Sequence, residues 1–112
     1  MDINTALLVF EQAAKAHGIA TETGNYKLGN KNYNKLIQAI NYLKSECQVD
    51  RLLNYLNNED CSVKLWAATY LLPSHEKTAL KVLMSLSKEK GLLSLNAETT
   101  IEEWQKGNLT IL

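Results

Sequence analysis

Hydrophobic residues recur at helical spacing in six segments of the chain, and strict alternation of apolar and polar residues is sustained nowhere. The first stripe predicts a helix that ends at Gly18, where a helix C-terminus favours a residue in the left-handed conformation. Its apolar positions are Ile3, Ala6, Leu7, Phe10, Ala13 and Ala14. After a polar break at residues 21–24, a second stripe predicts a helix whose first turns are weakened by Gly29. Its apolar positions are Tyr26, Tyr33, Leu36, Ile37, Ile40 and Leu43.

The middle of the chain predicts a short third helix and then a fourth that is apolar nearly all round. The third has apolar residues at i, i+3, i+4 and i+7, namely Val49, Leu52, Leu53 and Leu56. In the fourth, residues 63–72, only Lys64 and Thr69 are polar, and a helix of this kind is buried between neighbours on several sides. Pro73 ends it, because the residue before a proline is pushed out of the helical region. We therefore expect Trp66 to be the most buried aromatic residue, with Trp104 packed near it.

Two further helices complete the predicted fold. Ser74 is placed to cap the fifth helix, with Glu76 in the first turn, where the helix dipole favours an acidic residue. Its predicted inward positions are Ala79, Val82, Leu83 and Leu86, and its outward positions are Lys77, Lys81, Ser85 and Lys88. Asn96 can cap the last helix and Gly107 closes it, with an inner stripe at Ala97, Ile101 and Trp104. Six helices joined by short loops predict an all-α fold.

The segment that joins the third helix to the fourth resembles a HEAT repeat. In these repeats a leucine-rich first helix turns into a second helix that begins D-x-x-V-[RK]-x-x-A-A, and the alanines let the two helices approach closely. The corresponding residues here are Leu52-Leu53 with Leu56, then Asp60-Cys61-Ser62-Val63-Lys64, then Ala67-Ala68.

Over most of residues 1–110 the chain is also similar to a small bacterial family, domain of unknown function number two thousand and nineteen. Its motifs V-[RK]-L-W-A-A, G-L-L and A-x-x-[TS]-[LI]-x-E-W-x-x-G are matched at residues 63–68, 91–93 and 97–107. Towards the N-terminus the resemblance rests on Phe10 and residues 25–30. It implies one HEAT-like domain over residues 1–112, with antiparallel helix pairs in a short right-handed α-solenoid. The family brings no established activity and no catalytic residues, and HEAT repeats are docking scaffolds, so the resemblance implies binding.

Length and charge narrow the classes of function. The chain has 112 residues, with 12 Lys and Arg against 12 Asp and Glu, so its formal net charge is zero. This balance lacks the basic excess typical of nucleic-acid binders and argues against electrostatic capture by an anionic membrane. No apolar run is long enough to span a bilayer, and Asp2 stands where a signal peptide would be positive. We therefore expect a cytoplasmic protein in which Cys47 and Cys61 are reduced thiols that pack as small hydrophobic residues.

Few residues are able to carry catalysis. His17 and His75 are the only histidines, and His17 continues the apolar stripe of the first helix, as a structural residue would. Ser74 and His75 are adjacent, and we expect such neighbours at a helix start to point apart, whereas a nucleophile needs its base within hydrogen-bond reach. The two cysteines lack the spacing of a zinc site. The segment from Gly24 to Lys31 departs from a phosphate-binding loop, because its lysine is one residue too far along.

The clustered carboxylates lie on the last helix, at Glu98, Glu102 and Glu103. Glu98 and Glu102 share a face as a catalytic pair would, yet Glu102 can also reach Lys106, and a solvated helix face is the favoured interpretation. We therefore expect a protein without enzymatic activity, without a cofactor and without a metal site.

One surface feature suggests binding, and it lies on the second helix. Its members follow the i, i+4, i+8, i+11, i+15 rhythm of one helix face: Lys27, Lys31, Lys35, Gln38 and Tyr42. This basic stripe can meet an acidic partner protein or a nucleic-acid backbone with Tyr42 as an anchor, although an ordinary solvated face explains it too. Three lysines in a neutral domain release few counterions, which makes nucleic acid the weaker alternative.

The expected function is that of a non-enzymatic, cytoplasmic protein-interaction module whose partner is another protein. We expect a monomer or a weak homodimer that is not attached to a membrane. Two alternatives stay open at this point: an immunity protein that neutralises a toxin encoded beside it, and a nucleic-acid-associated HEAT-like domain, as in some repair proteins.

Overall fold

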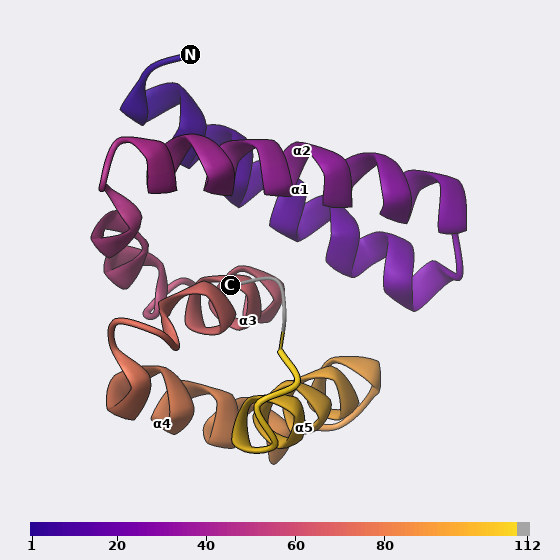
Figure 1. Cartoon of the computed structure of the whole chain (residues 1–112). Coiled ribbons are helices and arrows are strands. Elements are labelled where there is room, and N and C mark those ends of the chain that lie inside the picture. The colour runs from indigo at the N-terminus through magenta and orange to yellow at the C-terminus, as the bar shows by residue number, and fades with distance from the viewer. Residues whose placement is uncertain (110–112) are drawn as a thin grey trace. The chain divides into compact units, whose positions relative to one another are not determined.

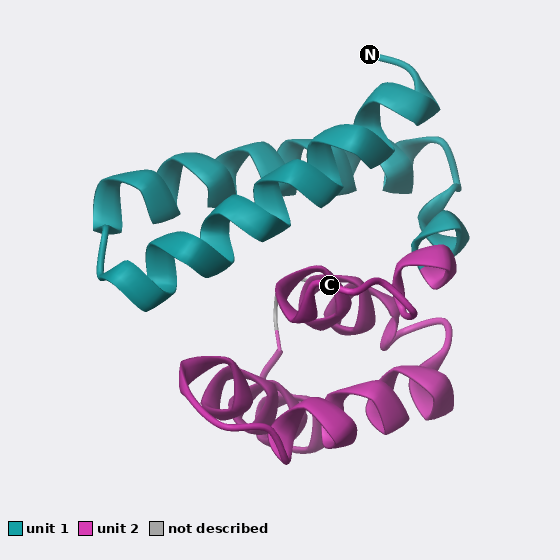
Figure 2. Cartoon of the chain, turned by 180° about the vertical axis from the view of Figure 1, so that it is seen from behind, with its two compact units in different colours: residues 1–52 teal, residues 53–112 magenta. Residues whose placement is uncertain are grey.

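The computed structural model describes residues 1–109, and these form five α-helices and one 3-10 helix, without any strand. The predicted all-α fold is therefore confirmed. The chain divides into two compact units, Met1–Leu52 and Leu53–Leu112, which Figure 2 shows in teal and magenta. The expectation of one domain over residues 1–112 stays a prediction.

The first unit is a hairpin of two long helices, α1 (Ile3–Thr23) and α2 (Tyr26–Ser45), which lie side by side and run antiparallel (Figure 1). Most of the buried residues of α1 are alanines, which let the two backbones approach closely around the fully buried Phe10. The apolar core of the hairpin consists of Ala6, Phe10, Ala13, Ala14 and Ala20 from α1 and Leu36, Ala39, Ile40 and Leu43 from α2. The two predicted stripes therefore face each other, but the prediction is wrong for Tyr26, which is 85% exposed at the start of α2.

The first helix does not end at Gly18, as predicted, but continues to Thr23. Ala20 extends the buried stripe by another turn, so burial outweighs the low helix propensity of Gly18. The residue that ends α1 is Gly24, with a φ of 68° and a backbone N–H directed at the carbonyls of Ala20 and Thr21. The backbone N–H of Asn25 also donates to the Ala20 carbonyl, at 2.9 Å, which completes a Schellman-type cap.

The segment predicted as a short third helix is a 3-10 helix, η1 (Val49–Tyr55), instead of an α-helix. Its hydrogen bonds span three residues, as in the bond from the Leu56 N–H to the Leu53 carbonyl at 3.3 Å. Only seven residues lie in this element, and so short a segment gains little from α-helical propagation. Leu52 and Leu56 are nevertheless buried, as the apolar spacing predicts.

The second unit contains α3 (Cys61–Leu71), α4 (Glu76–Ser87) and α5 (Leu92–Gln105). α4 packs against both α3 and α5, and α3 also contacts α5. Asp60 caps α3, because its carboxylate accepts hydrogen bonds from the backbone N–H groups of Ser62 at 2.8 Å and Val63 at 3.2 Å. The buried residues of α3 are Val63, Leu65, Ala67, Ala68, Thr69, Tyr70 and Leu71, so the predicted burial on several sides is confirmed.

The prediction that Trp66 is the most buried aromatic residue is wrong. Phe10 is 0% exposed and Tyr70 is 2% exposed, whereas Trp66 is only partly buried. The indole is too large to be enclosed easily, and it stacks on the Tyr70 ring, with 6.2 Å between centroids and 17° between planes. The packing of Trp104 near Trp66 stays a prediction.

The inward and outward faces of α4 agree with the prediction, but its cap does not. Ala79, Leu83 and Leu86 are buried, Val82 is partly buried, and the outward residues Lys77, Lys81, Ser85 and Lys88 are exposed. The N-cap position is held by His75, whose side chain makes no capping bond, and not by Ser74. Glu76 does lie in the first turn, where its carboxylate accepts a hydrogen bond from the Trp104 indole of α5 at 2.6 Å.

The last helix begins earlier than predicted, because its N-cap is Gly91 and not Asn96. α5 starts after Gly91, whose φ of 99° few other residues adopt, so Asn96 lies inside the helix and not at its N-cap. Gly107 closes the helix with a φ of 75°, as predicted, and its N–H donates to the Trp104 carbonyl at 3.1 Å. Of the predicted inner stripe, Ala97 is fully buried, and Ile101 and Trp104 are partly buried.

Candidate functional site

The five residues of the predicted basic stripe lie on the outer face of α2, and we call them the basic face: Lys27, Lys31, Lys35, Gln38 and Tyr42. The first four are exposed and Tyr42 is partly buried. α2 begins at the Asn25 cap, whose side chain accepts from the Leu28 N–H at 3.1 Å, and continues without a break through Gly29. The core residues Leu36 and Leu43 lie on the opposite side of the helix, so the hairpin core fixes which way the basic face points.

Charge on α2 is of one sign only. The helix contains four lysines and no aspartate or glutamate over its 20 residues. Among the described residues, none of Lys27, Lys31 and Lys35 takes part in an ion pair, whereas Lys15 of α1 pairs with Glu11 at 3.8 Å. Three exposed positive charges at four-residue spacing therefore face solvent on a chain whose formal net charge is zero.

The far end of the basic face has a different electrostatic environment. Burial raises the pKa of the Tyr42 hydroxyl, and the carboxylates of Glu46 and Asp2 raise it further, with Glu46 also hydrogen-bonded to it. Asp2 caps α1, where the backbone N–H of Thr5 donates to its carboxylate at 2.7 Å and lowers its pKa. The positive charge of the basic face is therefore concentrated at its Lys27 end, and Tyr42 lies beside acidic groups.

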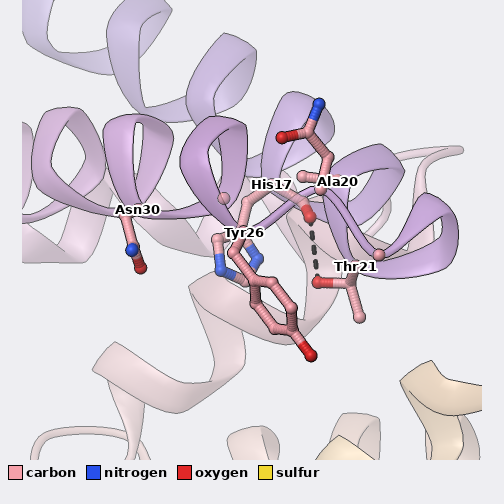
Figure 3. A pocket seen from close by; sticks show the side chains of 8 residues that line it. His17, Ala20, Thr21, Tyr26 and Asn30 are labelled. Carbon is pink, nitrogen blue, oxygen red and sulfur yellow. Dashed lines mark hydrogen bonds between the residues drawn. The ribbon is translucent and has the colours of Figure 1, made fainter.

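A hollow of about 240 Å³ lies at the turn between α1 and α2 (Figure 3). Several of its lining residues are small, and Gly29 is one of them. A Cβ at Gly29 would lie 3.7 Å from the Ala20 Cβ, at ordinary van der Waals distance. In Figure 3 the Thr21 hydroxyl points to the His17 carbonyl, to which it donates at 3.0 Å. The lining residues are His17, Ala20, Thr21, Gly24, Asn25, Tyr26, Gly29 and Asn30.

Two aromatic side chains that line the hollow, those of His17 and Tyr26, differ in exposure. The His17 imidazole lies between the helices, with its centroid 6.5 Å from that of the Tyr33 ring, and burial lowers the pKa of His17. Its neutral form is thus favoured, and the structural role expected of His17 stays a prediction. Tyr26, in contrast, is 85% exposed at the rim. The spacing of apolar residues does not reveal this hollow, because two helices form it jointly around a turn.

The structure brings Ser74 and His75 together, contrary to the sequence-based expectation that these neighbours point apart. The Ser74 hydroxyl oxygen lies 2.9 Å from His75 Nδ1. The turn after Pro73 places both side chains just before α4, where the backbone is not yet helical. Ser74 is exposed, so water reaches the hydroxyl freely, and nothing in this pair alone indicates catalysis.

Both cysteines are free, as predicted, but they do not both pack as small hydrophobic residues. Cys61 is partly buried at the start of α3. Cys47 is exposed in the turn after α2, with a φ of 55°, so the expectation is wrong for this residue. Cys47 follows the end of α2 in a turn, so the spacing of apolar residues along the helix does not predict its exposure.

The acidic residues of α5 form a solvated face, as predicted. Glu98 and Glu102 are exposed and Glu103 is partly buried. Neither Glu98 nor Glu102 has an ion-pair partner within residues 1–109, and α5 contains no lysine or arginine. Glu102 therefore does not pair with Lys106, which sequence spacing allows it to reach.

In the part of the chain that the structure describes, no three His, Cys, Asp or Glu side chains gather as metal ligands. None of the described helices combines the length and the apolar character that crossing a membrane requires. No protein-family model matches the chain, and neither does any curated protein or solved structure.

Proposed function

We propose that this protein is a non-enzymatic interaction module that binds an acidic surface of another protein through the basic face of α2. One observation carries the proposal: Lys27, Lys31 and Lys35 are exposed and form no ion pair with any of residues 1–109, on a helix that has no acidic residue. Because the whole chain is neutral, this charge is a local feature and not a consequence of composition.

The charge of the basic face determines how strongly and how fast it binds a partner. An exposed ion pair contributes about 0.2–1 kcal/mol, so three lysines alone give weak binding that salt weakens further. Their main effect is on the rate of encounter with an acidic partner. Leu28 is 37% exposed and lies on the same side of α2 as Lys31 and Lys35, so it supplies an apolar contact next to the charges. We infer a partner that carries both acidic and apolar side chains.

The fold we propose for this module is a short HEAT-like arrangement of helix pairs, in line with the resemblance of residues 52–68 to a HEAT repeat. Asp60 caps α3, and Val63, Ala67 and Ala68 are fully buried, which are the roles that the repeat pattern gives these positions. η1 departs from the pattern, because the first helix of a HEAT repeat is α-helical and η1 is not. Docking of protein partners is the usual role of HEAT repeats, which supports an interaction function.

A titration followed by nuclear magnetic resonance tests the proposed function. The ¹⁵N-labelled protein is titrated with a synthetic helical peptide that carries glutamate at every fourth position. We expect amide shifts at Lys27, Lys31 and Lys35, and we expect Lys31→Glu with Lys35→Glu to remove them. The matched control is Lys77→Glu with Lys81→Glu, which reverses two exposed lysines at the same spacing on α4 and should leave binding unchanged.

Two results contradict the proposal. Absence of shifts on α2 at low salt would show that the basic face does not bind acidic helices. Shifts that depend equally on the two pairs of lysines would show a non-specific charge effect. A parallel titration with a DNA duplex distinguishes the nucleic-acid alternative, which requires tighter, salt-dependent binding of DNA than of the peptide.

A further inference from the structure

We infer that the acidic surface bound by the basic face is α5 of a second copy of this chain, so that the protein self-associates through α2 and α5. This inference rests on the proposed function and names its partner. It follows from a correspondence between exposed residues of the two helices.

The two helices carry the same exposed row with opposite charge. On α2 the row is L-x-x-K-x-x-x-K-x-x-Q, formed by Leu28, Lys31, Lys35 and Gln38. On α5 it is L-x-x-E-x-x-x-E-x-x-Q, formed by Leu95, Glu98, Glu102 and Gln105. All eight residues are exposed. The spacing of three, four and three residues places each row on one face of its helix.

A parallel alignment of the two rows pairs every residue with a complementary one. Leu28 meets Leu95, each lysine meets a glutamate, and the two glutamines face each other. Since both rows rise by 1.5 Å per residue, the match is maintained over three turns of helix. Gln38 and Gln105 can exchange amide hydrogen bonds, because each amide group has donors and an acceptor.

The charges of both rows lack partners within the described chain. Lys31, Lys35, Glu98 and Glu102 make no ion pair among residues 1–109, and each helix has charged residues of one sign only. Leu95 is 56% exposed in the first turn of α5, where a contact with another leucine would remove apolar surface from water. The chain is neutral overall, but α2 carries positive and α5 negative charges. Such a separation allows the surface of one copy to complement that of another.

The expected strength of the association follows from the same residues. In a two-fold dimer the contact of α2 with α5 occurs twice, which doubles a contribution that is small in each contact. Ion pairs at exposed positions are weak and screened by salt, so we expect a dimer that forms only at high concentration and dissociates in about 1 M salt.

Sedimentation equilibrium on the full chain up to about 1 mM tests the inference, in the range in which weak complexes form. We expect concentration-dependent dimers. Lys31→Glu with Lys35→Glu should raise the dimer dissociation constant about tenfold or more, because four attractions become repulsions, and Glu98→Lys with Glu102→Lys should do the same. An equimolar mixture of the two variants should associate as a 1:1 complex, since both of its contacts again join opposite charges. Lys77→Glu with Lys81→Glu should associate like the parent protein.

The outcomes that overturn the inference are distinct from those that overturn the proposed function. A parent protein that stays monomeric up to about 1 mM contradicts self-association, while binding of the glutamate peptide by that monomer would leave the proposed function standing. Dimers that form without any effect of the charge reversals, or variants that fail to associate when mixed, contradict the pairing of α2 with α5. Circular dichroism shows whether each variant keeps its helices, as expected for exposed positions.

Discussion

Two glycines of the same hairpin should respond in opposite ways to the same substitution. Gly29 lies inside α2 with ordinary helical geometry, and a Cβ there would sit 3.7 Å from the Ala20 Cβ, at normal van der Waals distance. Gly24 ends α1 with a φ of 68°, and a Cβ there would meet nothing within 4 Å. Gly29→Ala should therefore stabilise the protein, and Gly24→Ala should destabilise it.

The magnitudes follow from backbone energetics. Alanine is preferred to glycine inside a helix by about 0.5–1 kcal/mol, and the methyl group at Gly29 adds an apolar contact without a clash. A non-glycine residue in the left-handed region costs about 1–2 kcal/mol, and no new contact at Gly24 offsets that cost. The free energies of unfolding of the two variants should thus differ by roughly 1.5–3 kcal/mol.

Thermal and urea unfolding followed by circular dichroism measures both variants. In a domain of roughly 60–100 residues, a change of 1 kcal/mol in the free energy of unfolding shifts Tm by about 4–8 °C. Gly29→Ala should therefore raise Tm by a few degrees, and Gly24→Ala should lower it by more. A Gly29→Ala protein that melts below the parent would refute the packing described around the hollow. A Gly24→Ala protein that melts with the parent would refute the left-handed cap.

Three further predictions concern the core, a helix cap and a titrating group. Phe10→Ala should lower the free energy of unfolding, measured with urea, by about 3–5 kcal/mol. Trp66→Ala should lower it by less, because the indole is partly exposed, and equal losses in the two variants would contradict the burial described. Asp60→Ala removes the acceptor of two backbone N–H groups of α3 and should cost about 1 kcal/mol, and an unchanged urea midpoint would speak against the cap. Burial lowers the pKa of His17 in the folded state, so as pH falls below about 6.5 the unfolded chain binds the proton first and stability declines. Tm measured across that window should fall less in His17→Gln, and an identical decline would exclude His17 as the cause.

The spacing of apolar residues predicts the existence and the faces of the helices, but it does not predict where they end. Gly18 has the chemistry of a helix end, yet the buried Ala20 carries α1 past it to Gly24. At α5 the reverse occurs, because Gly91 starts the helix ahead of Asn96, whose side chain makes it a good cap only where the backbone has not already turned helical. Several neighbouring residues can each end or begin a helix, and tertiary packing decides which of them does.

The basic face is predictable from the sequence because it depends only on the four-residue rhythm of one helix. The hollow near His17 is not, since residues of two helices form it around a turn. The matching rows on α2 and α5 are present in the sequence, but their meaning depends on knowing that Leu28 and Leu95 are exposed and not part of a core. A leucine at helical spacing normally indicates a buried face, and only the structure shows that these two are exceptions.

The central claim is that the basic face of α2 binds acidic protein surfaces, and one comparison tests it most directly. The affinity for the glutamate peptide is measured for the parent protein, for Lys31→Glu with Lys35→Glu, and for Lys77→Glu with Lys81→Glu. The claim predicts that reversing the α2 lysines lowers the affinity by at least about tenfold, and that reversing the α4 lysines does not lower it. It also predicts that in the parent protein the amide shifts are confined to α2. Equal affinities in all three proteins, or an equal loss in both variants, would contradict it.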